Sequence, residues 1–503
     1  MKLLGIDAGT THCKAGLFAE DGTALRIASR DMLIQRSPGG YAYYDPEELW
    51  QTVVSVIAEA TAETRPQEIS VVGVASMAET GLLIEKETGQ PRSFFIPWFD
   101  TAAANPAELI STATNSGMEE ERFKQTGIRP TFKCSLAKLL WLREQDQCLP
   151  DGAVWLSVAD YIAYRLTGHF ATDYSLAGRT YAFRIDQKTW NKELLGLFNL
   201  STGIFPDPQP GGNPVGRLSS DFSSIGLAKG TQAAICGHDH LCAAFAAGAA
   251  RPGHVFNSMG TAESLVGGIV ERALDRQDYL SGLGFGCHVV EGLSYWMGGI
   301  SASGGSIEWL RALLGEQPLS YQELDVLMDE ANASPGELLY IPHLAGRGSP
   351  NTDPSARGAF IGLSASHNRA DLLKAVLEGT AYEMEVIRQT AERATRLPIN
   401  PIIAAGGGTR NHRWMQIKAD VSGCRLVVPS IPEATLLGAA LVAGVGCGMY
   451  SSMEEALLPI EKSNHVEVYE PDEDRHAIYR CLYEQGYLPL QETLHQYTHS
   501  GER

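Results

Sequence analysis

The chain has 503 residues and a net charge of −19 at pH 7, from 59 acidic and 40 basic residues. This acidic excess argues against a general nucleic-acid binder and against a protein that docks on anionic membranes, although local backbone amides can still hold a phosphate. The composition is 44% hydrophobic and 20% charged, as in ordinary globular proteins, and the length predicts more than one domain.

The cysteines are typical of buried thiols in a reducing compartment. There are nine, an odd number, and none forms a CxxC pair. Cys236 and Cys242 flank His238 and His240, which raises the alternative of a metal site. Because the apolar run that Cys236 ends predicts a buried strand, we favour plain thiols over a metal site.

The sequence favours a cytoplasmic protein without a membrane segment. The chain reaches Asp7 too early for a signal peptide. The most apolar stretch, residues 434–450, carries four glycines and is barely long enough to span a bilayer, so a buried helix is expected there.

The first predicted element is a strand, a turn and a returning strand. Residues 3–6 are apolar, residues 7–11 (Asp-Ala-Gly-Thr-Thr) form a small polar turn, and residues 15–18 are apolar again. Gly9 lets the backbone approach an anion, and Thr10 offers an amide and a hydroxyl. By itself this is weak evidence, because small residues between strands commonly form only a turn.

A helix and a buried strand follow. Asp45 is a predicted N-cap, with Pro46 at the first helical position and Glu48 two residues further, and apolar residues continue at helical spacing to position 60. Residues 69–75 form a short apolar run suited to a buried strand.

Polar side chains come just beyond the carboxyl end of that strand, where open α/β sheets bind ligands. Residues 76–80 (Ser-Met-Ala-Glu-Thr) form one such place, and residues 96–100 (Ile-Pro-Trp-Phe-Asp) form a second. Trp98 is either a core residue or, beside Asp100, the apolar wall of a small-molecule pocket.

The segment from 101 to 230 carries no chemistry on its own. We expect helices over residues 136–141 and 157–167, and a loop over the Pro- and Gly-rich residues 204–216.

Asp239 follows another apolar run, residues 232–236, and precedes a helix of small residues over 241–250. A carboxylate at such a turn is either a helix N-cap or a functional group, and the residues alone leave both open. Arg251-Pro-Gly253 then interrupts the chain, which places the domain boundary near residue 250.

The second half opens on a turn like the first. Residues 257–263 (Asn-Ser-Met-Gly-Thr-Ala-Glu) lie between two apolar runs, and Gly260-Thr261 repeats the Gly9-Thr10 pair. Two such phosphate-holding turns, one in each half, suggest a nucleotide clamped between two similar domains.

Further glycines mark later turns. Gly304 and Gly305 would let a helix start approach a phosphate or a sugar. A strand over residues 402–405 leads into three glycines, 406–408, on which a flat group could lie. The pattern is not GxGxxG, so a Rossmann dinucleotide site is not supported.

The remaining elements complete an α/β unit. We expect an amphipathic helix over 371–393, strands over 338–342 and 426–428, and a Gly-rich helix over 434–446. The tail from residue 451 to 503 is acidic and then helical, and we expect it to pack on the second domain.

Taken together, the motifs resemble the FGGY carbohydrate kinases, which include glycerol, xylulose and gluconate kinases of the actin/Hsp70-like ATPase superfamily. The resemblance spans about residues 1–450. One family signature fits at Gly358, Phe360, Gly362, Leu363, Asp371, Leu372, Ala375, Val376, Leu377 and Glu378. The other covers Lys138, Leu139, Trp141, Leu142 and Glu144, but Lys133 stands at its first position, where the family prefers a small or aromatic residue. Shorter motifs occur in family order at 7–11, 258–261, Asp353-Pro354, Arg357-Gly358, 406–408 with Asn411, and Glu433 ahead of Gly438-Ala-Ala440.

The resemblance implies an α/β protein with two ribonuclease H-like domains, of the actin/Hsp70 ATPase type, around a central cleft. Residues 1–250 would bind the sugar and supply the catalytic base. Residues 251–503 would bind ATP and end in a helical tail.

The resemblance also assigns roles to residues. Asp239 would be the general base, and Asp7 would hold Mg²⁺, in line with the preference of hard cations for carboxylates. The implied ATP-binding residues are Thr10, Thr11, Lys14, Gly260, Thr261, Gly304, Gly407, Gly408 and Asn411. The implied substrate-binding residues are Met77, Glu79, Trp98, Asp100 and His240.

The implied substrate is a small sugar or polyol, either a ketose such as xylulose (a xylulokinase-like activity) or a short polyol. Around position 78 the chain departs from both family patterns: xylulose kinases carry Met-His and glycerol kinases Arg-Glu, whereas this chain has Met77-Ala78-Glu79. His240 either touches the substrate or is a capping or solvated histidine. The alternative from another class is a non-catalytic actin-like ATP-binding sensor or scaffold. Dimers are frequent in the family, so a homodimer is compatible with the resemblance.

Overall fold

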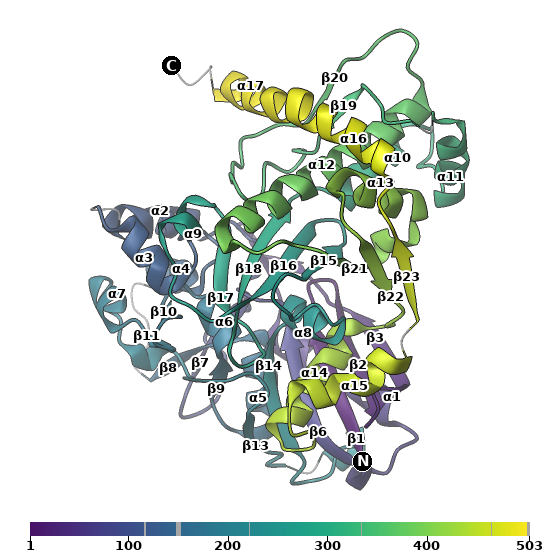
Figure 1. Cartoon of the computed structure of the whole chain (residues 1–503). Helices are drawn as coiled ribbons and strands as arrows, with labels where there is room; N and C mark the ends of the chain where they lie inside the picture. Colours follow the sequence, from purple (N-terminus) through teal and green to yellow (C-terminus); the bar gives the residue numbers. More distant parts are fainter. Residues whose placement is uncertain (115–116, 147–151, 221, 333, 464, 500–503) are drawn as a thin grey trace.

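The computed structural model describes residues 1–503 except 115–116, 147–151, 221, 333, 464 and 500–503. Within this part of the chain, two large mixed β-sheets, one from each half, lie one above the other with helices around and between them (Figure 1). The two-domain α/β architecture expected from the sequence is thereby confirmed.

The first sheet has six described strands in the order β13-β14-β6-β1-β2-β3. Strands β1, β6 and β14 run parallel, while β2, β3 and β13 are antiparallel to their neighbours. The strands are β1 (Lys2–Ala8), β2 (His12–Ala19), β3 (Ala24–Asp31), β6 (Ile69–Ser76), β13 (Pro214–Arg217) and β14 (Gln232–His238).

The second sheet repeats this plan. Its described strands follow the order β17-β18-β16-β15-β21-β22-β23, with β15, β21 and β22 parallel and the others antiparallel to their neighbours. The strands are β15 (Val255–Met259), β16 (Glu263–Val270), β17 (Gly284–Cys287), β18 (Leu293–Ile300), β21 (Ile402–Ala405), β22 (Leu426–Pro429) and β23 (Val466–Tyr469). In each half, therefore, a hairpin carrying a Gly-Thr turn supplies the first strand of the parallel set.

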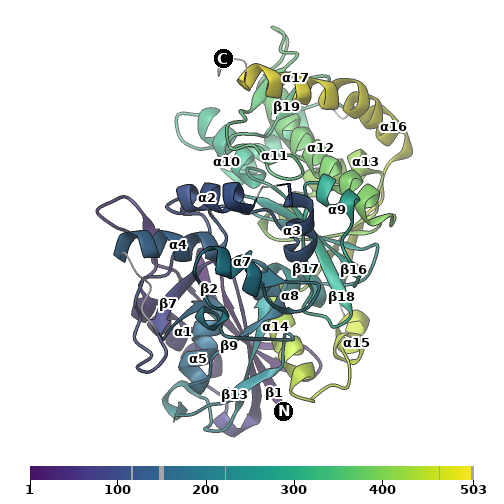
Figure 2. The same cartoon turned by 90° about the vertical axis from the view of Figure 1, so that its left-hand side faces the viewer.

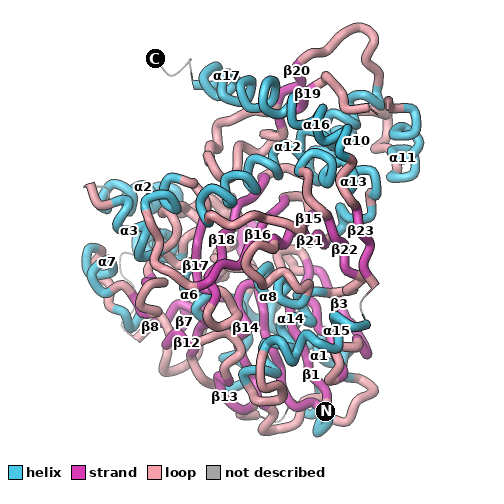
Figure 3. Tube along the Cα trace, in the orientation of Figure 1, coloured by secondary structure: helices cyan, strands magenta, loops and turns pink. Residues whose placement is uncertain are grey.

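Helices cover both sheets (Figures 2 and 3). Those of the first half are α1 (Pro46–Thr61), α2 (Ala104–Thr114), α3 (Glu119–Thr126), α4 (Ser135–Asp146), α5 (Val158–Thr167), α6 (Tyr174–Gly178), α7 (Lys192–Leu197) and α8 (Asp239–Ala246). Those of the second half are α9 (Arg276–Leu280), α10 (Gly304–Leu313), α11 (Tyr321–Glu330), α12 (Arg369–Thr395), α13 (His412–Ser422), α14 (Ala434–Gly446), α15 (Met453–Ser463), α16 (Glu473–Leu482) and α17 (Leu488–His499).

Short two-stranded sheets are formed by β4 (Gln35–Arg36) with β5 (Ala42–Tyr43), β7 (Gly81–Glu85) with β8 (Ala153–Ser157), β9 (Ala171–Asp173) with β12 (Asp207–Gln209), β10 (Phe183–Arg184) with β11 (Thr189–Trp190), and β19 (Leu339–Ile341) with β20 (Ala359–Ile361).

Local sequence signals determine several of these elements. The Asp45 carboxylate accepts hydrogen bonds from the amides of Glu47 and Glu48 and begins α1, as its spacing predicted. The apolar runs at 69–75 and 402–405 are strands β6 and β21, and the long amphipathic pattern is helix α12.

Helices α8 and α14 form a layer between the two sheets (Figure 1). Although α14 comes late in the chain, it packs on α8 and on β1 and β6 of the first sheet. A Cβ atom added at Gly438 would lie 2.0 Å from the Cys242 carbonyl oxygen, and one added at Gly73 would lie 2.2 Å from that of Ala439. Glycine is therefore what allows α14 to approach both α8 and the sheet so closely.

Parts of the expected picture need correction. The tail was expected to pack on the second domain, and α16 and α17 do so, but α15 packs beside α14 in the core of the first sheet. Residues 204–216, predicted as loop, contribute β12 and the beginning of β13, an edge strand. These short strands lack an alternating pattern of their own, so pairing with distant partners determines them.

Two expectations drawn from composition can be compared with the structure. The eight cysteines that it describes are all free thiols, and Cys148 lies outside the described residues. No helix in the described part of the chain is both long and apolar enough to cross a membrane.

Candidate active site

The first Gly-Thr turn joins β1 to β2, and Asp7 lies at the end of β1. Its Oδ1 atom is buried and has no hydrogen-bond partner among the described residues. Burial, and next the nearby Asp239 carboxylate, raise the pKa of Asp7 well above the ordinary value, although Lys14 opposes this. A buried carboxylate with an orphaned oxygen, whose pKa a second carboxylate raises, makes a site suited to a cation.

Asp239 is the first residue of α8, directly after β14. The N-cap position belongs to His238, so Asp239 does not cap the helix. Its Oδ1 atom accepts a 2.6 Å hydrogen bond from the His240 amide and lies 3.2 Å from His238 Nε2. Burial raises the pKa of Asp239, and His240 limits the rise.

His238 is buried beside Asp239. Burial, followed by His240 and Arg179, lowers its pKa well below the ordinary histidine value, so the ring is neutral. A neutral ring whose Nε2 carries the proton would donate to Asp239 and hold the carboxylate in one orientation.

Lys14 connects the two halves of the chain. It lies on β2, and its ammonium is 2.8 Å from Oε1 and 2.9 Å from Oε2 of Glu433, the N-cap residue of α14. Lys14 therefore ties the strand after the first Gly-Thr turn to the helix that lies between the two sheets.

Trp98 links the first turn to the expected sugar pocket. Its indole nitrogen donates a 2.8 Å hydrogen bond to Thr10 Oγ1, and its backbone amide donates to Thr80 Oγ1. Met77 Sδ lies 3.7 Å from the same Thr10 hydroxyl and is buried. The structure thus brings Met77 and Trp98 together at the Thr10 side chain.

Glu79 is held in a strained conformation. Its φ of 67° is in the left-handed region, which is uncommon for a residue other than glycine and which concentrates at functional sites. Arg179, at the end of α6, lies 2.5 Å from Glu79 Oε1, and Lys138 donates a 2.6 Å hydrogen bond to the Glu79 carbonyl. Burial alone would raise the pKa of Glu79, but Arg179, Lys133 and Lys138 outweigh it and hold the pKa below its ordinary value.

The Asp100 carboxylate accepts hydrogen bonds from the backbone on both oxygens. Its two carboxylate oxygens accept hydrogen bonds from the amides of Ala42 at 2.6 Å and Ala102 at 2.8 Å. This geometry favours a role in holding the Trp98 loop over a direct contact with a ligand.

Three backbone segments converge at the second Gly-Thr turn. The amide of Gly304, which begins α10, donates to the Gly260 carbonyl at 3.2 Å, and the amide of Gly305 donates to the Thr261 carbonyl at 2.9 Å. A Cβ atom at Gly304 would lie 2.5 Å from the Gly260 oxygen, and one at Gly408 would lie 3.0 Å from Met259 Cβ.

A buried ion pair supports this turn from below. Lys418 on α13 and Glu263 on β16 are fully buried, with Nζ 2.7 Å from Oε1. Asn257 donates to Oε1 at 2.9 Å, and the Ser303 hydroxyl donates to Oε2 at 2.5 Å. Glu263 therefore joins the β15–β16 turn to the start of α10 and to α13.

The remaining expected nucleotide residues lie at the turn surfaces. Thr11, Gly260, Thr261 and Gly407 are exposed. Asn411 Oδ1 caps α13 by accepting from the Trp414 amide, which leaves its side-chain amide nitrogen for other contacts. Within the described chain, hydrogen bonds link Thr10 to Met77 and Trp98, whereas the Gly260, Gly304 and Gly408 segments form a separate cluster on the second sheet.

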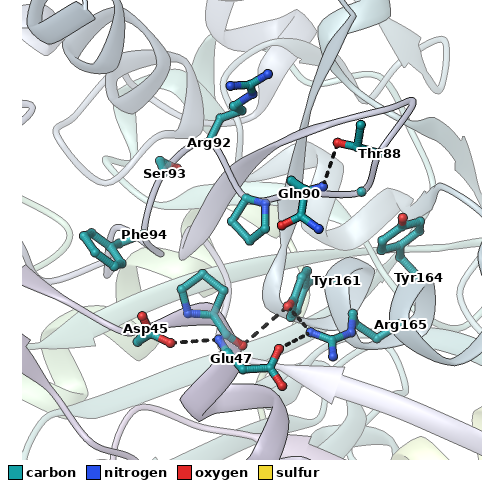
Figure 4. Close-up of a pocket in the computed structure, with 13 residues that line it drawn as sticks. Asp45, Glu47, Thr88, Gln90, Arg92, Ser93, Phe94, Tyr161, Tyr164 and Arg165 are labelled. Atoms are coloured by element: carbon teal, nitrogen blue, oxygen red, sulfur yellow. Dashed lines mark hydrogen bonds and ion pairs between the residues drawn. The ribbon is translucent and has the colours of Figure 1, made fainter.

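A surface cavity lies elsewhere. It has a volume of about 680 Å³ and contains none of the residues expected in the site (Figure 4). Figure 4 shows the Arg165 guanidinium beside the Glu47 carboxylate, which it contacts at 2.9 Å. We therefore do not take it as the active site.

Family models decide the identity. The N-terminal domain model described as "FGGY family of carbohydrate kinases" matches residues 2–246, and the C-terminal domain model of the same family matches residues 255–447. The chain belongs to the FGGY family of carbohydrate kinases. It is therefore a carbohydrate kinase, and the alternative of a non-catalytic sensor or scaffold is not supported.

Relatives of this FGGY kinase include a glycerol kinase from Citrifermentans bemidjiense, 31% identical over 474 residues that cover 89% of this chain and 90% of the relative. A solved xylulose kinase from Rhodospirillum rubrum is 26% identical and superposes with a TM-score of 0.88, covering 99% of this chain and all of that one. A Plasmodium falciparum glycerol kinase solved with ADP, 20% identical, shares the fold with a TM-score of 0.84 and 97% coverage of both chains.

Sequence reasoning missed some of the charged groups in this FGGY kinase. Arg179 is 100 positions from Glu79 and follows a short helix, so no local pattern joins them. In the sequence, His238 stands out only as a neighbour of cysteines, although its position next to Asp239 is a signal for a role. The Glu263–Lys418 pair spans 155 positions and carries no local signal.

Proposed function

We propose that this FGGY kinase transfers the γ-phosphoryl group of ATP to a hydroxyl of a small sugar or polyol, with Asp239 as the general base. The observation that carries the proposal is the placement of Asp239 beside Asp7 at the end of the first sheet, next to the Thr10 turn. Kinases of this kind need positioning and charge neutralisation more than covalent help from the protein.

In the proposed reaction, the acceptor hydroxyl oxygen attacks the γ-phosphorus, and the bond from that phosphorus to the bridging oxygen of ADP breaks. The hydroxyl proton passes to the Asp239 carboxylate as the new bond forms. A base with a raised pKa suits this role, because it holds the proton more readily than an ordinary aspartate near neutral pH. His238 would keep the carboxylate in place.

The residues also fit a divalent cation. Asp7 has a buried oxygen without a hydrogen-bond partner among the described residues. Lys14 is the nearby cation, but it does not bring the raised pKa of Asp7 back to its ordinary value. We propose Asp7 as the Mg²⁺ ligand, in preference to the imidazoles of His238 and His240, because Mg²⁺ favours oxygen ligands. A bound Mg²⁺ would supply charge neutralisation for the phosphates.

The roles proposed for the other residues follow the two clusters. Thr10, Thr11 and Lys14 would face the phosphates from the first sheet, and Gly260, Thr261 and Gly304 from the second. Gly407, Gly408 and Asn411 would lie near the adenine.

Met77, Glu79, Trp98 and His240 would line the sugar pocket. Asp100 would act on the sugar through the Trp98 loop, because backbone amides already occupy its carboxylate.

The test is a coupled assay of ADP release with Mg-ATP across glycerol, tetritols, ketopentoses, ketohexoses and aldonates. One compound that raises turnover well above the background ATPase rate establishes the activity. Asp239→Asn should then lower kcat by at least roughly a hundredfold while ATP still binds in a titration by calorimetry. Asp325→Asn, an exposed change on α11, is the matched control. Unchanged turnover in Asp239→Asn would refute the assignment of the base.

The location and the assembly of the protein stay predictions. We propose a cytoplasmic enzyme, and sedimentation velocity of the purified chain would distinguish a homodimer from a monomer.

A further inference from the structure

Positive charge gathers at one end of the proposed sugar pocket. Three cationic side chains, Arg179, Lys133 and Lys138, act together on the single carboxylate of Glu79 and favour its ionised form. Arg179 and Glu79 are both largely buried, with side chains 16% and 10% exposed. The next question is which of these charges the protein itself neutralises.

Two of the cations are already committed. Arg179 pairs with Glu79 at 2.5 Å, and the Lys138 ammonium donates to the carbonyls of Glu79 at 2.6 Å and Ile96 at 3.2 Å. The other carboxylate of this region, Asp100, accepts from two backbone amides. Both Asp100 oxygens are therefore occupied, and Glu79, whose Oε1 is bonded to Arg179, forms no ion pair within 4 Å with a third cation among the described residues.

Lys133 is that third cation. Its ammonium lies 5.1 Å from the centre of the Trp98 ring and 6.0 Å from that of Phe132. Among the described residues, its Nζ atom takes part in no ion pair within 4 Å and in no hydrogen bond. Arg179 also has an unused donor, because its Nε atom is buried without a partner.

Trp98 fixes where these unused donors lie. The indole nitrogen of Trp98 donates a hydrogen bond to Thr10 in the first Gly-Thr turn. The Lys133 ammonium lies over the face of the same ring. Trp98 thus lies between the turn and Lys133. A substrate lying along the indole would have its reacting hydroxyl toward the Thr10 turn and its other end toward Lys133.

We infer that the substrate carries a carboxylate at the end opposite the phosphorylated hydroxyl, and that Lys133, with Arg179 beside it, binds this group. The substrate class is then a small polyhydroxy acid. This inference rests on the proposed kinase function and narrows its substrate.

The physical reason is the cost of an unpaired charge. A cation held beside an aromatic ring and among other cations is stabilised when an anion completes the pair, and carboxylates suit both ammonium and guanidinium donors. Lys133 also stands where the resembling family prefers a small or aromatic residue, so the charge is a departure that a neutral polyol does not require.

The experiment compares matched pairs that differ only in the end group: glycerol with glycerate, erythritol with erythronate, and xylitol with xylonate. Each is assayed for kcat/KM with saturating Mg-ATP in the wild-type chain, Lys133→Gln and Lys133→Arg. Lys229→Gln, an exposed lysine in the loop before β14, controls for the general loss of one positive charge. Binding of each compound without ATP is measured by calorimetry in the same variants.

We expect the wild-type chain to prefer the acid of at least one pair by tenfold or more. Lys133→Gln should lower kcat/KM for that acid by roughly ten- to a hundredfold and leave the neutral partner nearly unchanged, whereas Lys133→Arg should retain most of the preference. Lys229→Gln should behave as the wild type.

Other results would overturn the inference. A neutral member that equals or exceeds its acid in every pair would do so, as would equal losses for acid and neutral member in Lys133→Gln. A preference for glycerol 3-phosphate over glycerate would overturn the assignment of a carboxylate.

Failure of the proposed function gives a different result. If no compound, charged or neutral, stimulates ADP release, the kinase proposal fails, and the binding data still decide the inference. If the wild-type chain binds an acid and Lys133→Gln abolishes that binding, the carboxylate inference is supported. If no acid binds, or if acids and neutral compounds bind equally, the inference is overturned.

Discussion

At the level of single residues, two neighbouring carboxylates dominate the electrostatics of the active site. The pKa of Asp7 is raised above the ordinary value of 3.8 by burial and by Asp239. The folded chain therefore binds this proton more tightly than the unfolded chain. The resulting stabilisation is fully present below about pH 3.8 and is lost as the pH rises through the folded pKa.

Asp7→Asn should consequently stabilise the metal-free protein at neutral pH, on the order of 1 kcal/mol, because it removes a buried charge. The same change should abolish the rise in melting temperature that Mg²⁺ and ADP produce together in the wild type. Thermal unfolding with and without Mg-ADP measures both effects, and Asp325→Asn is the control. A destabilised Asp7→Asn chain that still responds fully to Mg-ADP would contradict this reasoning.

The raised pKa of Asp239 makes a second prediction, for the rate. The base works when deprotonated, so phosphoryl transfer should fall as the pH decreases through that pKa, at a higher pH than for an exposed aspartate. A profile of kcat/KM against pH for the best acceptor measures this, with apparent values that belong to the Asp7–Asp239 pair. A rate that stays constant down to pH 4 would exclude the raised pKa.

At the level of elements, the second Gly-Thr turn depends on a helix far away in the sequence. Lys418→Met would leave Glu263 as an unpaired buried charge, at a cost of about 3–5 kcal/mol in the free energy of unfolding. Glu263 also accepts hydrogen bonds from Ser303 and Asn257, which flank the second Gly-Thr turn. A displaced Glu263 should disturb this turn and therefore raise the KM for ATP. Urea unfolding and ATP kinetics measure these two effects.

The double variant Glu263→Gln with Lys418→Met tests the cause, because it removes the uncompensated charge. It should recover much of the stability lost in Lys418→Met. Lys462→Met, at an exposed position on α15, is the control. If the double variant is less stable than the single one, the unpaired charge is not the cause.

The contact between α8 and α14 supplies another prediction. Gly438→Ala places a methyl group 2.0 Å from the Cys242 carbonyl oxygen, so the two helices must separate. We expect a loss of about 1–3 kcal/mol in the free energy of unfolding, measured with urea. Gly196→Ala on α7, where an added methyl group meets nothing within 4 Å, should be neutral or slightly stabilising. Equal behaviour of the two variants would show that the packing at Gly438 tolerates a side chain.

Elements with a strong local pattern could be predicted from the sequence, and elements made by distant pairing could not. Asp45 with Pro46 predicts the start of α1, and the apolar runs predict β6 and β21, because capping and periodicity act over a few residues. Strands β13 and β23 are short edge strands whose partners determine them. In the candidate site, the two Gly-Thr turns were visible in the sequence, whereas Arg179 was brought to Glu79 only by the fold.

At the scale of the whole molecule, the two sheets repeat one topology, and α14 crosses back from the second half to cover the first sheet. A fragment of residues 1–250 would leave the apolar surface under α14 uncovered. We expect this fragment to aggregate or to bind a hydrophobic dye, and we expect co-expression with residues 251–503 to restore a well-packed complex. Size-exclusion chromatography and dye fluorescence measure this. A monodisperse, cooperatively unfolding fragment would contradict the prediction.

The late arrival of α14 also matters while the chain is being made. The first sheet and α8 are complete when residue 246 has been synthesised, but their covering helix begins only at residue 434. At about 5–20 residues per second, the ribosome needs roughly 10–40 s to add the intervening segment. During that interval the nascent chain displays an apolar face that the finished enzyme never shows, so its yield in a cell should depend on translation speed and on chaperones that bind at the ribosome exit.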